Sequence, residues 1–247
     1  MISIFLLNTF LLSIRLLPVL VVSSILFFSR IPLTIRLILS LALASVLASA
    51  LPSIQAPSLS LPVLLGELCL GVVMAFGFHA AHAGVDMAGR LIDTQVGLNA
   101  SGVFDPTTSN VTSIMADFLG LAFALLFVVL DMHHELLRVM GGMLTVIPPG
   151  SVPSVSLSGS LAAVLTQQFL MAFMMLMPVI MGLWLTDMAF AILSRSMPQA
   201  NIYFLALPIK LGIGVLLILL TLPLLVQRMP LLFESALSSA ATPAGGL

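Results

Sequence analysis

Six apolar runs, each long enough to form a helix that crosses a membrane, dominate this sequence. They cover residues 4–29, 31–51, 63–85, 112–130, 161–186 and 200–227. A membrane-crossing helix needs about 20 apolar residues, and it is stable in lipid because all its backbone hydrogen bonds are internal. Only 7% of the residues are charged, against roughly 25% in soluble domains. We therefore expect an all-α, polytopic membrane-type protein with about six hydrophobic helices arranged in hairpins.

Small residues recur along the third apolar run and its continuation. Gly77 and Ala81 are four residues apart, and so are successive members of the series Ala80, Gly84 and Ala88. Residues at this spacing share one face of a helix, and in lipid such small-residue faces let helix backbones approach closely. The pattern predicts that this helix packs tightly against its neighbours.

Charged residues are rare along the same helix. Glu67 is the only acid of the run, and Asp86, Arg90 and Asp93 follow it at positions i, i+4 and i+7, a spacing that places these three on one helical face. Two interpretations remain open. The triplet is either a solvated helix end with self-paired charges or a contact with another subunit. On the second interpretation Glu67, Asp86, Arg90 and Asp93 are candidates for subunit contact.

A polar, turn-rich loop, residues 99–111, interrupts the apolar chain. Its glycine, proline, asparagine, aspartate and serine residues favour turns over helix or strand. Irregular backbone is tolerated at membrane depth only where it lines a cavity or is buried in protein. Val103 and Phe104 form an apolar tip, which we expect to act as a stopper in a narrow passage. The candidate plug residues are Ala100, Ser101, Gly102, Val103, Phe104, Asp105 and Pro106.

The densest group of titratable residues lies at 131–138. A zinc-protease motif needs two histidines four residues apart around a glutamate, and Arg138 stands where the histidine after His134 would be. His79 and His82 share a helical face, but no third ligand lies near them in the sequence. We interpret these histidines as interfacial or polar-network residues and expect no metal and no cofactor.

Glycine and proline mark a second loop. The breakers are Gly141, Gly142, Pro148, Pro149 and Gly150. They predict a Pro/Gly-rich loop over residues 141–160.

A second polar stretch lies between the last two apolar runs. Ionisable and amide groups at such depth are costly unless they meet partners, so they indicate a functional site. The candidates for subunit contact here are Arg195, Pro198, Gln199, Asn201 and Lys210. The alternative interpretation is that Pro198 and Pro208 break a helix and that Lys210 extends its charge to an interface.

Four stretches together resemble the FliR family of flagellar export-gate proteins, with the virulence-type SctT group as close kin. They are FSRIPLTIRL at 28–37, the region from GELCLGVVMAF to AGRLIDTQVGL at 66–98, the FDP turn at 104–106, and PQANIYFLALPIK at 198–210. The last stretch is the most specific of the four. The resemblance covers nearly the whole chain, so we expect a single FliR-like domain over residues 1–247.

The resemblance implies a structural and gating subunit of a type III protein export channel. Its partners would be FliP-like and FliQ-like subunits in a helical ring, together with FlhB-like and FlhA-like proteins and unfolded export substrates. The implied location is the bacterial inner membrane at the flagellar basal body, with the helices raised toward the periplasm in the assembled gate. Residues 100–110 correspond to the family's plug loop.

Other function classes are weaker. The net charge of −1 gives no basic surface for nucleic acid. A virulence-type export gate is the main alternative. A secondary transporter would show internal repeats, and none is convincing here. A membrane enzyme using residues 131–138 lacks a recognisable motif, and we expect the protein not to be an enzyme.

Overall fold

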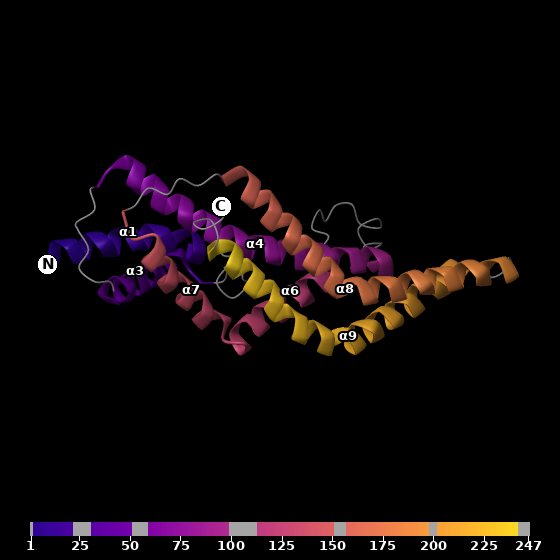
Figure 1. Cartoon of the computed structure of the whole chain (residues 1–247). Helices are drawn as coiled ribbons and strands as arrows, with labels where there is room; N and C mark the ends of the chain where they lie inside the picture. Colours follow the sequence, from indigo (N-terminus) through magenta and orange to yellow (C-terminus); the bar gives the residue numbers. More distant parts are fainter. Residues whose placement is uncertain are drawn as a thin grey trace, which may run out of the picture.

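The computed structural model describes residues 2–21, 31–50, 59–98, 113–150, 157–197 and 202–241. Helices, and no strand, occur within these ranges, which confirms the predicted all-α fold. The described helices are α1 (Ile2–Val21), α3 (Leu33–Ala50), α4 (Leu61–Val96), α6 (Ile114–Val129), α7 (Met132–Val146), α8 (Leu157–Ser196) and α9 (Ile202–Ala241). Figure 1 shows an elongated bundle with α1 and α3 toward one end and an arm made of α8 and α9 at the other.

The helices have the lengths and composition of membrane spans. Helices α1, α4, α8 and α9 are each long and apolar enough to cross a membrane, while α6 and α7 pass the same test only as a pair bent by 67°. The helix α3 is apolar but shorter. The described chain therefore has the predicted polytopic character, with four or five candidate spans in place of six.

Helix α4 is the centre of the fold, because it packs against α1, α6, α8 and α9. Its small-residue face is buried, with Ala81 and Ala88 almost inaccessible. A Cβ atom placed on Gly84 would lie only 2.9 Å from the Cβ of Ala172 in α8. The two helices therefore touch at this glycine, which confirms the close packing predicted from the sequence.

Helices α1 and α3 pack against one another, and an arginine joins the end of α1 to the start of α3. The Arg36 guanidinium donates hydrogen bonds to the carbonyl oxygens of Val21, at 2.8 Å, and Ile31, at 2.9 Å. Carbonyl groups in the last turn of a helix lack partners within the helix. Arg36 therefore satisfies the end of α1 and ties it to the start of α3.

The predicted loop over residues 141–160 is wrong at both ends, because α7 continues through Gly141 and Gly142 to Val146 and α8 begins at Leu157. Glycine costs roughly 1 kcal/mol relative to alanine in a helix. That cost is outweighed by burial: Met140, Met143 and Leu144 pack into a core shared with α1, α3 and α4, and a fully buried side chain of this size contributes roughly 1.5–3 kcal/mol.

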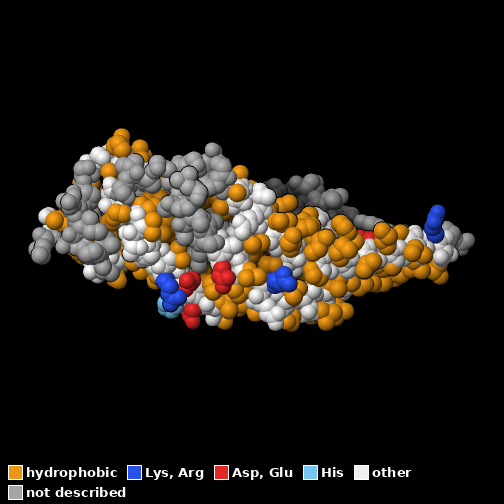
Figure 2. Space-filling model, in the orientation of Figure 1, with side chains coloured by type: hydrophobic (Ala, Val, Ile, Leu, Met, Phe, Trp, Pro, Cys, Tyr) orange, Lys and Arg blue, Asp and Glu red, His pale blue; other side chains and the backbone are white. Residues whose placement is uncertain are grey.

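Helices α8 and α9, with 40 residues each, pack against one another and extend beyond the rest of the bundle (Figure 1). Both continue through proline, at Pro178 in α8 and at Pro208 in α9, so Pro208 does not break a helix. Large apolar side chains are exposed along this arm, for example Leu185 at 69% and Phe204 at 71%. Figure 2 shows hydrophobic side chains covering much of its visible surface.

Candidate functional site

A buried carboxylate joins the two helices, α4 and α6, that flank residues 99–112. Asp93, in the last turn of α4, is fully buried and accepts hydrogen bonds from the Ser113 hydroxyl and from the backbone N–H of Met115, the latter at 3.1 Å. Ser113 is also the N-cap of α6, and its hydroxyl oxygen accepts a hydrogen bond from the backbone N–H of Ala116. The carboxylate and the hydroxyl therefore join the end of α4 to the start of α6.

The backbones of α4 and α6 are also in close contact near Asp93 and Ser113. A Cβ atom on Gly89 would lie 2.5 Å from the Cα of Ala116, so α4 and α6 can meet here only because residue 89 has no side chain. Gly97, the C-cap of α4, has φ +85°, a conformation that glycine adopts without steric cost. The predicted plug residues, 100–106, lie outside the described residues.

A buried ion pair joins α1, α4 and the segment after α7. The Arg15 guanidinium donates to both carboxylate oxygens of Glu67, at 2.6 and 3.1 Å, and to the carbonyl oxygen of Ile147 at 3.0 Å. Glu67 also accepts the backbone N–H of Gly150 at 2.8 Å. The Arg15 and Glu67 side chains are 4% and 0% exposed. A buried charge is tolerable only when it is paired and hydrogen-bonded, and this network meets both conditions.

The burial of Glu67 and Asp93 argues against the prediction that these residues contact another subunit. Glu67 and Asp93 are candidates in the sequence, but both are fully buried and have partners within the chain. They therefore join helices of this subunit. The pairing of Glu67 was not predicted, although Arg15 and Glu67 are each the lone charge of an apolar run, a signal that each needs a partner.

The predicted charge triplet on α4 divides into two parts. Arg90 and Asp86 form an i,i+4 ion pair at 2.8 Å, with the Arg90 side chain 59% exposed, whereas Asp93 is turned into the α4–α6 contact. The Asp86–Arg90 pair alone is left on the surface, where it is available to a partner subunit.

Lys210 has a partner that the sequence did not reveal. Its Nζ atom lies 2.5 Å from Oδ1 of Asp187 in α8, and its side chain is only 15% exposed. Arg195, another candidate for subunit contact, is exposed in the last turn of α8, where a cation complements the helix dipole. Pro198, Gln199 and Asn201 lie outside the described residues.

These observations define an all-helical, multi-pass membrane-type protein whose buried charges fasten its helices to one another. The chain belongs to the family described as "Bacterial export proteins, family 1", whose model matches residues 6–236.

The proteins to which the chain is similar are named either as flagellar biosynthetic proteins or as a surface presentation of antigens protein. The chain is 29% identical over 164 residues to the flagellar biosynthetic protein FliR of Pectobacterium carotovorum subsp. carotovorum, covering 66% of this chain and 63% of that protein. It is 26% identical over 202 residues to FliR of Escherichia coli (strain K12), covering 79% of this chain and 76% of that protein. It is also 29% identical over 174 residues to the surface presentation of antigens protein SpaR of Salmonella typhimurium, covering 65% of this chain and 60% of that protein.

The match therefore spans less than two thirds of the length of the Pectobacterium protein and about three quarters of the Escherichia coli protein.

Proposed function

We propose that this protein is a structural and gating subunit of the flagellar type III protein export gate in the bacterial inner membrane. The observation that carries this proposal is the family match over residues 6–236, together with similarity to flagellar biosynthetic proteins. An all-helical, membrane-type fold with several candidate spans suits such a subunit.

The proposed partners are FliP-like and FliQ-like subunits in one ring, with FlhB-like and FlhA-like proteins nearby and unfolded export substrates as cargo. Exposed apolar side chains on the α8–α9 arm support a partner surface, because large apolar patches mark interaction sites or lipid contact. The exposed Asp86–Arg90 pair and the exposed Arg195 are charges that a partner subunit can reach. Pro198, Gln199 and Asn201 remain proposed contact residues.

The gating part of the proposal concerns residues 100–106, with Val103 and Phe104 as the apolar stopper. Its support comes from the described residues on either side of that segment. Asp93, Ser113 and the Gly89–Ala116 contact hold α4 and α6 together on either side of residues 99–112. The residues on either side of the proposed plug are therefore held close together, as a plug that stays in one place would require.

A virulence-type export gate is the second candidate, because SpaR has the same percentage identity as the Pectobacterium FliR. The flagellar assignment is favoured by the extent of the match: the Escherichia coli FliR alignment covers 79% of this chain, and the SpaR alignment covers 65%.

Purification from membranes tests the proposal. The tagged protein, expressed in a flagellated host with its neighbours, should be recovered in mild detergent as part of a large multi-subunit ring. Expressed alone, it should be scarce and protease-sensitive, because its arm has no partner to cover it. Accumulation of the lone chain as a monodisperse, protease-resistant monomer that joins no ring would contradict the assignment. Complementation of non-motile fliR cells, compared with secretion-deficient spaR cells, separates the flagellar from the virulence role.

A further inference from the structure

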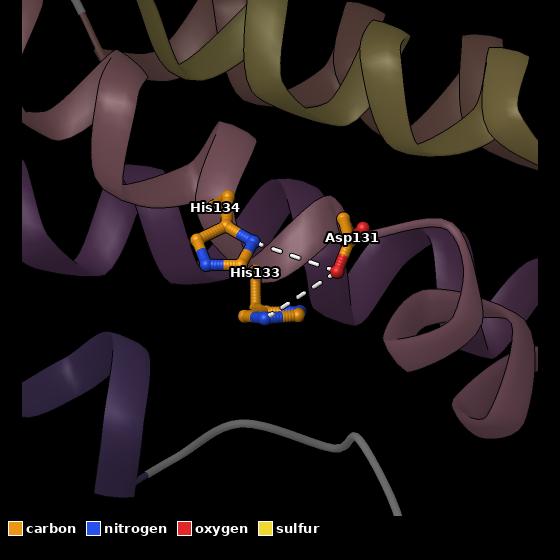
Figure 3. Close-up of side chains that lie close together, drawn as sticks. All are labelled: Asp131, His133 and His134. Atoms are coloured by element: carbon orange, nitrogen blue, oxygen red, sulfur yellow. Dashed lines mark ion pairs between the residues drawn. The ribbon is translucent and has the colours of Figure 1, made fainter.

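Three side chains converge at the elbow between α6 and α7. Asp131, His133 and His134 each present a metal-binding atom, and these atoms all lie within 4.8 Å of one another. Figure 3 shows both imidazole rings beside the Asp131 carboxylate, with His133 and His134 in the first turn of α7. The elbow brings the three groups together, since Asp131 itself has a left-handed backbone with φ 54°.

The Asp131 carboxylate is at the N-cap of α7 but does not cap the helix. An aspartate at a helix N-cap normally accepts a backbone N–H of the first turn, but the Asp131 side chain makes no such bond. Its Oδ1 atom instead faces Nδ1 of His134 at 3.5 Å and Nε2 of His133 at 3.8 Å. The carboxylate is therefore available to a ligand.

These separations match ligands on a shared ion better than direct hydrogen bonds. An N–H···O hydrogen bond spans about 2.7–3.2 Å between heavy atoms. Nitrogen and oxygen ligands lie about 2.0–2.2 Å from a zinc ion, so two of them at a tetrahedral angle are roughly 3.3–3.5 Å apart. The two separations from the Asp131 oxygen, 3.5 and 3.8 Å, lie near this value, and all three donor atoms lie within 4.8 Å of one another.

We propose that Asp131, His133 and His134 bind one divalent transition-metal ion of the zinc class. Two imidazole nitrogens and one carboxylate oxygen form a donor set that suits zinc, copper or nickel rather than magnesium or calcium, which prefer oxygen ligands. The Nδ1 atom of His133 is buried, which leaves its Nε2 atom for the ion. Glu135 lies nearby but its carboxylate binds Arg138 at 2.6 Å, so it is not counted as a ligand.

The position of the site defines its effect. A bound ion would link the N-cap residue of α7 to two residues of its first turn, directly beside the 67° bend between α6 and α7. The ion would then fix the N-cap and first turn of α7, next to the bend. Three protein ligands leave at least one coordination position open, and the exposure of His134 and Asp131 keeps that position accessible.

Metal titration of the full-length protein tests the proposal. The protein is purified in detergent with a tag that contains no histidine, in a Cys69→Ser background that removes the single thiol. Zn²⁺ is titrated by calorimetry, and Co²⁺ is used as a spectroscopic probe of the ligand geometry. We expect one ion per chain, with no uptake of Mg²⁺ at the same concentration.

Substitutions of the three residues test whether they bind the ion. Asp131→Asn, His133→Ala and His134→Ala should each weaken Zn²⁺ binding by roughly tenfold or more, and the double histidine variant should abolish it. Glu135→Gln, a change in the same turn of helix, should leave binding unchanged, and circular dichroism should report equal helix content in all variants. Absence of stoichiometric Zn²⁺ uptake would overturn the proposal, and so would uptake that survives the double histidine variant.

Discussion

The buried Asp93 carboxylate accepts hydrogen bonds from the Ser113 hydroxyl and the Met115 backbone N–H across the contact between α4 and α6. Twenty residues separate Asp93 from Ser113 in the sequence, and the segment between them contains the proposed plug. The pair therefore joins the described residues on either side of that segment.

Asp93→Asn should weaken the contact between α4 and α6 and lower the stability of the protein. The neutral asparagine amide is a weaker acceptor than the carboxylate, and its NH₂ group cannot accept the Ser113 or Met115 hydrogen. The free energy of unfolding should therefore fall by about 1.5–3 kcal/mol. Thermal unfolding of the purified protein in detergent, followed by circular dichroism, should show a lower midpoint. Asp86→Asn is the matched control, since that aspartate is half-exposed on the same helix and should change the midpoint little. Equal midpoints for the two variants would contradict a role for Asp93 in fastening the helices.

The Arg15–Glu67 pair predicts a non-additive mutant cycle. Arg15→Met leaves the Glu67 carboxylate buried without its partner, and Glu67→Met leaves the guanidinium in the same state. Each single change should cost roughly 3–5 kcal/mol. The double variant replaces both charges with apolar side chains and should recover much of that loss. Stability in a denaturant titration measures the cycle, and single-variant effects that simply add would show that the two charges are not coupled.

Two glycines of the same chain should respond to alanine in opposite directions. Gly89→Ala places a Cβ atom 2.5 Å from the Ala116 backbone, so α4 and α6 must separate and stability should fall by about 1–3 kcal/mol. Gly141, inside α7, has no heavy atom within 4 Å of the same added atom. Gly141→Ala should therefore stabilise α7 by about 0.5–1 kcal/mol. Unfolding midpoints of the two variants that moved together would show that close helix contact is not the reason for the glycine at position 89.

Several parts of this fold could be predicted from the sequence because they depend on local pattern. The apolar runs predicted every described helix except α7, and the spacing of Ala80, Gly84 and Ala88 predicted the closely packed face of α4. A helix cap at Thr112 or Ser113 could be expected from their place before an apolar run. Each of these signals lies within one helical segment and needs no knowledge of its neighbours.

Other features depended on tertiary contacts that no local pattern contains. The spacing of Asp93 placed it beside Arg90, but α6 covers that aspartate and removes it from the surface. Glu67 pairs with Arg15, 52 residues away, and the identity of that partner follows only from the crossing of α1 and α4. The helix α7 passes through two glycines because its apolar face is buried, and burial outweighs local propensity.

Lys210 supplies a prediction about assembly. Lys210→Ala removes the partner of Asp187 and should lower the yield of the multi-subunit ring, while stability within the chain should fall by only ~0.2–1 kcal/mol because Asp187 is partly exposed. The exchange Lys210→Asp with Asp187→Lys separates two roles. Restored ring yield would place the requirement in this pair, and a persistent defect would indicate an acid on a partner subunit. Ring yield that Lys210→Ala leaves unchanged would refute the role in assembly.

The last prediction concerns the plug. Replacing residues 100–110 by a short Gly-Ser linker should make the assembled gate leak small ions and solutes. The linker can close the gap because Asp93 and Ser113 already hold the neighbouring helix ends together, so assembly should be largely retained. Phe104→Ala should leak less than the deletion, since burying one phenyl ring contributes only about 1.5–3 kcal/mol and the rest of the loop still excludes water.

Thr108→Ala is the control for the plug experiment, because it changes a polar residue of the same loop that lies outside the apolar tip. Membrane conductance and the sensitivity of cells to small toxic solutes are compared for the four forms, with ring yield measured in parallel. The expected order of leakage is deletion, then Phe104→Ala, then the control and the unchanged chain together. A closure made by one apolar tip must be weak enough for an engaged substrate to displace it, so a graded leak is the physical signature of a stopper. If the deletion assembles and remains as tight as the unchanged chain, residues 100–110 are a surface connection and the seal lies elsewhere.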